Sequence, residues 1–148
     1  MSSDILTPPK KILVCVDGSE AGFRAADFAM AIAAGIRSEL IFMNVVGAST
    51  AEKEYNITAD MVGSFEVLGM EALAKCEEKA WRNGLVCEKL QVSGDPSEEI
   101  LRSAKQLECD CIVAGRMRFD EAEKLLMGSV SDKVLKQSSV PVIIVNTK

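Results

Sequence analysis

The stretch "AGRMRFDEAEKLLMGSVSDKVL", from Ala114 to Leu135, contains the transition that decides the fold. An apolar run ends at Gly115, a charged and bulky segment follows, and a helical pattern begins at Gly128. One interpretation is a phosphate cradle, because a helix N-terminus offers an anion unpaired N–H groups and a positive dipole end. The other interpretation is a strand, a surface loop and a helix capped by an ordinary serine.

Apolar runs of the same kind recur along the rest of the chain. Most are short, β-branched and nearly continuous, which is typical of strands covered on both faces. The third run alternates more and is expected nearer an edge of the sheet. The predicted strands are Lys11–Val16, Leu40–Val46, Leu85–Val92, Asp110–Gly115 and Val140–Asn146.

Helical patterns separate these runs. Two long segments carry apolar residues at the three- and four-residue spacing of one helix face. The first stripe consists of Phe28, Ala29, Ile32, Ala33 and Ile36, and the second of Met61, Phe65, Leu68, Ala72, Cys76 and Ala80.

The ends of the other helices carry recognisable signals. Gly84 suits the C-cap of the second helix. Asp95 suits an N-cap and Pro96 the first helical position of a third helix, whose core face is Ile100, Ala104 and Leu107. A last helix from Gly128 carries Val130, Val134 and Leu135. Strands that alternate with helices predict an α/β fold, a doubly wound five-stranded parallel sheet of order 3-2-1-4-5 with helices on both faces.

Length and charge limit the functions that this protein can have. The 148 residues fit one domain, expected over residues 1–148 with a flexible N-terminus at 1–9. With 17 basic and 22 acidic residues the net charge is −5, and no basic stripe is present, which argues against nucleic-acid binding. No segment reaches the roughly 20 apolar residues of a membrane span, and the N-terminus lacks a signal-peptide core. We therefore expect a cytoplasmic protein without a membrane partner.

The sequence contains no histidine and five cysteines. The absence of histidine removes Ser-His-Asp and Cys-His catalysis, and we assign no catalytic residue. Cys15, Cys109 and Cys111 fall in apolar runs, so packed, reduced thiols are expected. Cys109 and Cys111 are predicted to share a strand face, but nothing completes a tetrahedral metal site around them.

Ligands of a doubly wound sheet bind beyond the carboxyl ends of the strands, where the strand order reverses. Here that point lies between the first strand, which ends at Val16 and Asp17, and the fourth, which ends at Gly115. Neither G-x-x-x-x-G-K-[ST] nor G-x-G-x-x-G follows the first strand, so two common nucleotide motifs are excluded. What remains is Gly128-Ser129-Val130-Ser131 at a helix start, which by itself fits a cap as well as an anion site.

At this point the chain resembles the universal stress protein family, from about Lys10 to Asn146. The first strand and helix are similar in "KKILVCVDGSEAGFRAADFAMAIA" and the second strand in "LIFMNVV". The third helix and fourth strand are similar in "GDPSEEILRSAKQLECDCIVAG". The most specific part is the C-terminal signature, "LLMGSVSDKVLKQSSVPVIIVN".

ATP-binding members of that family carry G-x2-G-x9-G-[ST] after the fourth strand. Gly115, Gly128 and Ser129 match at the right spacing, whereas Arg118 replaces the second glycine. A left-handed conformation there would cost a non-glycine residue roughly 1 to 2 kcal/mol. Arg118 could therefore block the loop, or its guanidinium, with Arg116 or Lys124, could bind a phosphate directly.

The resemblance implies a nucleotide site, and we assign no metal-ligating side chain. Asp17 and the backbone near Val45 would hold the adenine end, although Asp17 fits a turn or a cap equally well. The glycine- and serine-rich segment would hold ribose and phosphates. The implied nucleotide-binding residues are Val16, Asp17, Val45, Gly115, Arg118, Gly128, Ser129, Val130 and Ser131.

Three functions are compatible with this resemblance. The favoured one is a stress-response module that binds ATP, or AMP or ADP, with Mg²⁺ as a candidate companion, and acts as a ligand-dependent switch or partner-binding dimer. The alternative is a nucleotide-free dimeric interaction protein of the same fold, which Arg118 favours. A slow ATPase is the least favoured, because no general base or arginine finger can be named. The resemblance also implies a homodimer through the last strand, Val140–Asn146.

Overall fold

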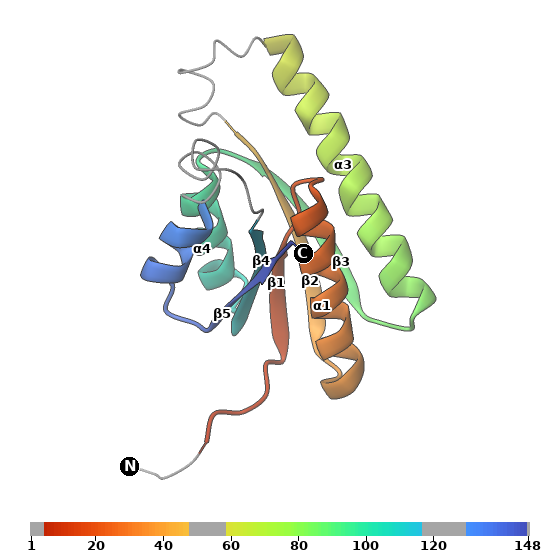
Figure 1. The fold of residues 1–148 in the computed structure, drawn as a ribbon, viewed down its shortest axis with the longest axis vertical. Coiled ribbons are helices and arrows are strands. Elements are labelled where there is room, and N and C mark those ends of the chain that lie inside the picture. Colours follow the sequence, from red (N-terminus) through yellow and green to blue (C-terminus); the bar gives the residue numbers. More distant parts are fainter. Residues whose placement is uncertain (1–4, 48–58, 117–129, 148) are drawn as a thin grey trace.

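Five parallel strands form one sheet in the computed structural model, which describes residues 5–47, 59–116 and 130–147 (Figure 1). The strand order is β3-β2-β1-β4-β5, and every neighbouring pair is parallel. This confirms the predicted order and the position of the third strand at an edge. The strands are β1 (Lys11–Cys15), β2 (Glu39–Val46), β3 (Cys87–Ser93), β4 (Cys111–Arg116) and β5 (Val142–Asn146).

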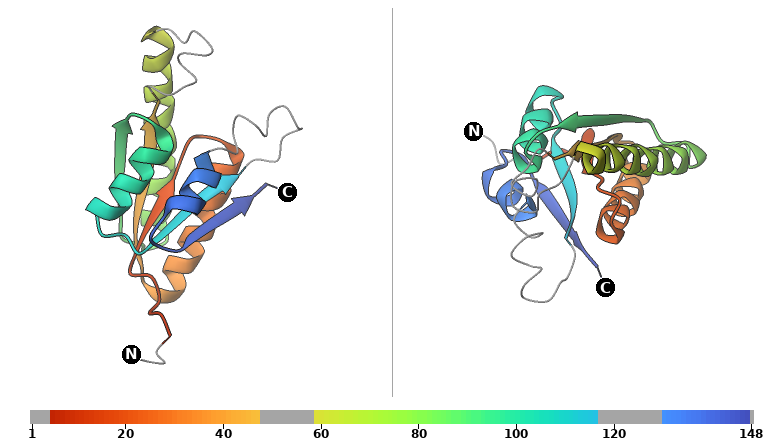
Figure 2. Two further views of the ribbon diagram at one scale, coloured as in Figure 1. Left: turned by 90° about the vertical axis from the view of Figure 1, so that its left-hand side faces the viewer. Right: turned by 90° about the horizontal axis from the view of Figure 1, so that it is seen from above.

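Helices cover both faces of this sheet (Figure 2). α1 (Glu20–Ile36) and α3 (Ala59–Arg82) pack on one face, and α4 (Pro96–Gln106) packs on the other together with a helix at 130–137. The central strand supplies both hydrophobic cores, since Ile12 and Val14 face α1 and α3 while Leu13 faces α4, all with no exposed surface. The chain therefore has the predicted doubly wound α/β fold.

The face by which α1 meets the sheet differs from the predicted stripe. Phe28 is 46% exposed and Ile36 is 42% exposed, so these two predictions are wrong. Apart from Met30, the buried face is made of small residues, which let the helix backbone lie close to β1 and β4. Its members are Ala21, Gly22, Ala25, Ala26, Ala29, Met30 and Ala33.

The second predicted stripe is confirmed only over part of α3. Ala72, Cys76 and Ala80 are buried, whereas Phe65 and Leu68 are 47% and 58% exposed. Figure 1 shows the reason, because the N-terminal part of α3 extends past the carboxyl ends of the strands. Side chains 59–62, including the predicted Met61, lie outside the described residues.

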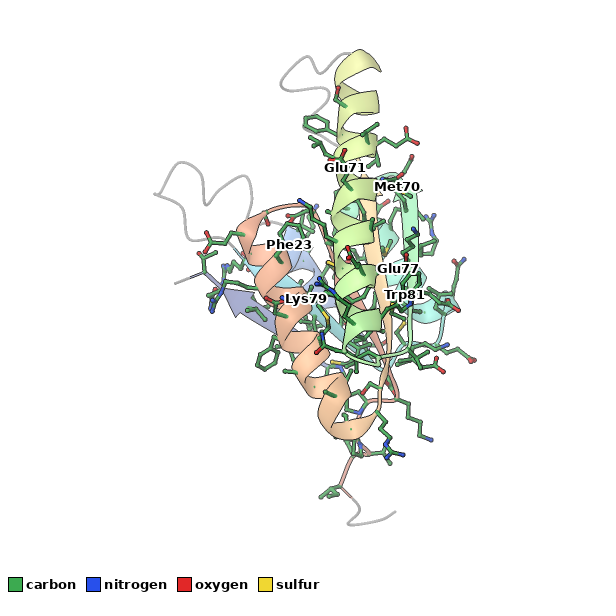
Figure 3. All side chains as sticks on the ribbon, turned by 90° about the vertical axis from the view of Figure 1, so that its right-hand side faces the viewer. Phe23, Met70, Glu71, Glu77, Lys79 and Trp81 are labelled. Atoms are coloured by element: carbon green, nitrogen blue, oxygen red, sulfur yellow. The ribbon has the colours of Figure 1, made fainter. Side chains whose placement is uncertain are left out.

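α3 is tied to α1 by polar contacts on the surface. Lys79 donates to Asp27 at 2.7 Å, and Figure 3 shows Lys79 on the side of α3 that faces α1. The Lys75 ammonium lies 6.0 Å from the centre of the Phe23 ring. Gly84 then ends the helix region with φ +70°, as the predicted C-cap requires.

The cysteines are packed thiols, as predicted, but one detail is wrong. Cys111 faces α1 and α3, whereas Cys109 faces α4, because β4 begins only at Cys111 and Glu108 adopts φ 55° before it. Burial raises the pKa of Cys76 and of Cys109 to about 11. Among the helices in the described ranges, none combines the length and apolar composition that a bilayer crossing requires.

The start of α4 matches the predicted cap. The Asp95 carboxylate accepts from the Glu98 N–H at 3.1 Å and from the Ser97 hydroxyl at 2.8 Å, and Pro96 occupies the first turn. These bonds, with the Glu98 N–H as the largest cause, lower the pKa of Asp95 below its usual value. Carboxylate capping of this kind stabilises the ionised form.

We expect Asp95→Ala to lower the free energy of unfolding by about 1 kcal/mol at pH 7, because it removes the cap. The pKa of Asp95 is lower in the folded state, so the ionic part of its contribution is present above about pH 4, the unfolded pKa, and is lost as pH falls through the folded pKa. Urea denaturation across this range measures the effect. Asp95→Ser, which keeps a neutral cap, is the control, and equal urea midpoints for wild type and Asp95→Ala at pH 7 would contradict the assignment.

Candidate functional site

The register of the strands brings the predicted site residues of three strands to one edge of the sheet. Val14 pairs with Val113 on β4 and Cys15 pairs with Met43 on β2. β1 ends at Cys15 and is followed directly by Val16 and Asp17, while β2 continues through Val45 and β4 through Gly115. The carboxyl ends of β1, β2 and β4 therefore converge where the strand order reverses, the predicted ligand position of this fold.

Asp17 organises the turn from β1 into α1. Its Oδ1 accepts from the backbone N–H of Ser19 at 3.0 Å and from the Ser19 hydroxyl. Ser19 Oγ in turn accepts from the Gly22 N–H at 3.0 Å and caps α1. Within the described ranges, Oδ2 of the exposed Asp17 makes no hydrogen bond. Asp17 is thus a turn residue that still presents one carboxylate oxygen to solvent.

Gly115 lies directly against the first turn of α1. A Cβ atom at this position would stand 2.8 Å from the Gly22 nitrogen and closer still to the backbone carbonyl of Ala21. At Gly22 a Cβ would lie 2.5 Å from Asp17 Oδ1, so a side chain there would displace the Asp17 carboxylate from the turn. The packing of α1 on the strand ends therefore requires glycine at Gly115, independently of any ligand.

The backbone of Val16 is already paired within the protein. Its N–H donates to the Met43 carbonyl at 2.7 Å, and its carbonyl accepts from Asn44 Nδ2 at 2.8 Å. Val45, on the next strand, is half-buried on the α4 side of the sheet. Asn44 was not among the predicted site residues, although one polar residue within "LIFMNVV" was a signal that could have identified it.

The helix at 130–137 begins beside the end of β4. Arg116 Nη2 lies 3.0 Å from Asp132 Oδ1, and both side chains are partly exposed. Ser131 is buried and Val130 is half-buried. Arg118, Gly128 and Ser129 lie outside the described residues, so their roles stay predictions. No group of three or more His, Cys, Asp or Glu side chains in the described ranges could hold a metal ion.

Comparisons with known proteins agree on one family. Residues 8–146 match the model of the universal stress protein family. The chain is 30% identical to universal stress protein YxiE of Bacillus subtilis, covering 91% of this chain and 97% of the relative.

Solved structures show the same fold. A universal stress protein in complex with cAMP superposes with a TM-score of 0.75 at 24% identity, covering 96% of this chain and 100% of the other. A universal stress protein family protein from Arabidopsis thaliana with AMP bound gives a TM-score of 0.72 at 20% identity, covering 95% and 93%.

We expect Gly115→Ala to lower the free energy of unfolding by about 1 to 3 kcal/mol, because the new methyl group meets backbone atoms of α1 that have no alternative position. Gly35→Ala is the matched control, since a Cβ at Gly35 meets nothing within 4 Å and alanine favours the helix. Urea denaturation of both variants measures the difference. Equal stability of the two variants would show that the contact at Gly115 can relax.

Proposed function

Because the chain belongs to the universal stress protein family, we propose that it binds an adenine nucleotide, with ATP as the first candidate, at the carboxyl ends of β1, β2 and β4. The observation that carries the proposal is the convergence of Asp17, Val45 and Gly115 at one edge, beside the start of the helix at 130–137. Relatives of the same fold solved with cAMP and AMP support the choice of an adenine nucleotide.

The adenosine end is assigned to the exits of β1 and β2. Asp17 Oδ2 can accept a hydrogen bond from a ribose hydroxyl or an adenine amine, while Oδ1 keeps the turn in place. The backbone of Val45 is assigned to the adenine edge. The N–H and carbonyl of Val16 are both paired, so Val16 shapes the wall of the site and contributes at most the second lone pair of its carbonyl.

The phosphate end is assigned to the start of the last helix. Residues Gly128 to Ser131 would offer backbone N–H groups, hydroxyls and the positive end of the helix dipole. The negative charge of Asp132 at this end is offset by Arg116, 3.0 Å away. An exposed ion pair contributes about 1 kcal/mol or less, so the Arg116 guanidinium can turn to a phosphate, and Arg118 would add a second guanidinium.

A magnesium ion would enter with the nucleotide phosphates. Within the described residues no group of three or more acidic, histidine or cysteine side chains could hold the ion alone, which fits a Mg²⁺ whose shell is completed by phosphates and water. Binding to the folded state alone would stabilise the fold by about 2.7 kcal/mol at a free ligand concentration of one hundred dissociation constants. This is the physical basis for a ligand-dependent switch in the cytoplasm.

The same family membership leads us to propose a homodimer through β5. The Ile112 N–H donates to the Pro141 carbonyl and the Thr147 N–H to the Arg116 carbonyl, so odd-numbered residues of this strand face β4. The peptide groups of Val142 and Ile144 therefore point away from the sheet, at its edge. An apolar edge strand of this kind is commonly covered by a partner.

A nucleotide-free dimer of the same fold is the second candidate. Two observations favour it: Arg118 stands where ATP-binding members have glycine, and the packing against α1 already accounts for Gly115. Under this reading the strand ends form a structural turn, and function resides in the dimer surface alone.

Calorimetric titration with Mg-ATP and with AMP separates these candidates. We expect micromolar binding to the wild-type chain, lost in a Gly128→Val, Ser129→Val double variant. Asp17→Asn, which keeps Oδ1 but removes the charge, should weaken binding about tenfold, or about 1.4 kcal/mol. Asp110→Asn is the matched control, because Asp110 accepts from the Lys10 and Lys11 N–H groups at the opposite end of β1. No heat and no thermal stabilisation of folded protein at millimolar ATP would favour the nucleotide-free dimer.

Sedimentation velocity tests the dimer. We expect Ile144→Pro to convert a wild-type dimer into a folded monomer, because proline removes an outward-facing donor and leaves the bonds to β4 intact. Ile144→Val, which keeps the N–H and the apolar side chain, should remain dimeric. A wild-type chain that sediments as a monomer at micromolar concentration contradicts the proposed interface.

A further inference from the structure

A chain of amide hydrogen bonds runs beneath α3 to the exit of β1. Asn44 on β2 is only 6% exposed, and both polar atoms of its side chain form hydrogen bonds. Its Nδ2 donates to the Val16 carbonyl at 2.8 Å. Its Oδ1 accepts from Nε2 of Gln91, the residue directly opposite on β3, at 3.1 Å. The two amides thus connect the edge strand to the residue that precedes Asp17.

The other end of this chain is the backbone of α3. Gln91 Nε2 also donates to the Glu66 carbonyl at 2.8 Å, so one amide group uses both of its hydrogens. Gly69, one turn further along α3, packs directly against the side chains of Asn44 and Gln91. A Cβ there would stand 2.6 Å from Asn44 Cγ and 2.9 Å from Gln91 Nε2. The contacts with Asn44 and Gln91 therefore fix the height of α3, that is, the distance at which this helix packs above the sheet.

This arrangement is costly to disturb at any single point. Asn44 lies on the face that α3 covers, so loss of the Gln91 donor leaves the Asn44 oxygen buried without a partner. Loss of the Asn44 donor frees the Val16 carbonyl, which lies next to Asp17 and its turn. A shift of α3 thus changes the hydrogen bonds at the end of β1. Conversely, a movement of the backbone at the end of β1 changes the contacts on which α3 packs.

We propose that Asn44 and Gln91 are positioning residues that couple the height of α3 to the conformation of the β1–α1 turn around Asp17. The coupling itself stands on the described contacts; its use as regulation rests on the proposed nucleotide site. A nucleotide that engages Asp17 then restrains the N-terminal part of α3, and a partner that binds this part of α3 alters nucleotide affinity by the same factor. The exposed Phe65 and Leu68 lie on that part of the helix.

Amide hydrogen exchange of the full chain tests the coupling without a ligand. We expect Gln91→Met, which removes both donors and keeps the length of the side chain, to speed exchange at Gly18, Ser19 and Gly22 by at least about threefold. Gln106→Met is the matched control, since Gln106 is exposed at the end of α4 on the other face of the sheet. A rise confined to α3 and β3 would show a purely local role and overturn the proposal.

A second arm adds Mg-ATP. In the wild-type chain, ATP should slow exchange both in residues 16–22 and in residues 63–72, and the effect on 63–72 should disappear in Gln91→Met. Protection of 16–22 with no change at 63–72 in the wild type overturns the coupling. If the wild-type chain binds no nucleotide, the proposed function fails, and the ligand-free arm alone decides the coupling. Asn44→Leu, a more direct cut, should reproduce the ligand-free result if that variant folds.

Discussion

The direct contact between the first turn of α1 and the end of β4 is the constraint on which the rest of the candidate site depends. Gly115 has no side chain because the Ala21 carbonyl occupies that space, and a side chain at Gly22 would displace the Asp17 carboxylate. The small residues along α1 continue this close approach over the length of the helix. As a result, Asp17 is held against the N-terminus of α1, and its remaining oxygen is directed by the turn rather than by a flexible loop.

Much of this architecture was predictable because the signals are local and repeated. Four nearly continuous apolar runs and one alternating run identified the five strands, and their alternation with helices led to the sheet order. The helix faces were predicted less well. Periodicity finds a stripe, but it favours large residues such as Phe28, whereas α1 meets the sheet through alanine. It also assumes that a whole stripe is covered, and α3 extends beyond the strands that would cover Phe65.

The candidate site was predictable in position more than in chemistry. The strand order brings Asp17 and Gly115 to one edge of the sheet, where both lie against the first turn of α1, and their role toward a ligand stays a prediction. The spacing of glycines in the sequence cannot distinguish a glycine that makes room for a phosphate from one that makes room for a packed helix. At Gly115 the close approach of α1 is enough to explain the glycine. Nor can a sequence show that the Val16 carbonyl already accepts a hydrogen bond, because its donor, Asn44, is far along the chain. In the sequence Asn44 is only a polar residue within an apolar run.

The pairing of β1 with β4 affects the order in which the protein folds during its synthesis. Ile12 is opposite Cys111, so the central strand acquires this neighbour only after three helices and two other strands have been synthesised. Contacts between such distant segments carry a large loop-closure entropy and form late in folding. The edge at which the carboxyl ends of these two strands meet therefore cannot exist on an incomplete chain. A ribosome-bound intermediate that has formed β1, β2 and β3 would hold Asp17 in its turn but would lack the contact of Gly115 with α1, so the proposed nucleotide site would be completed only in the finished protein.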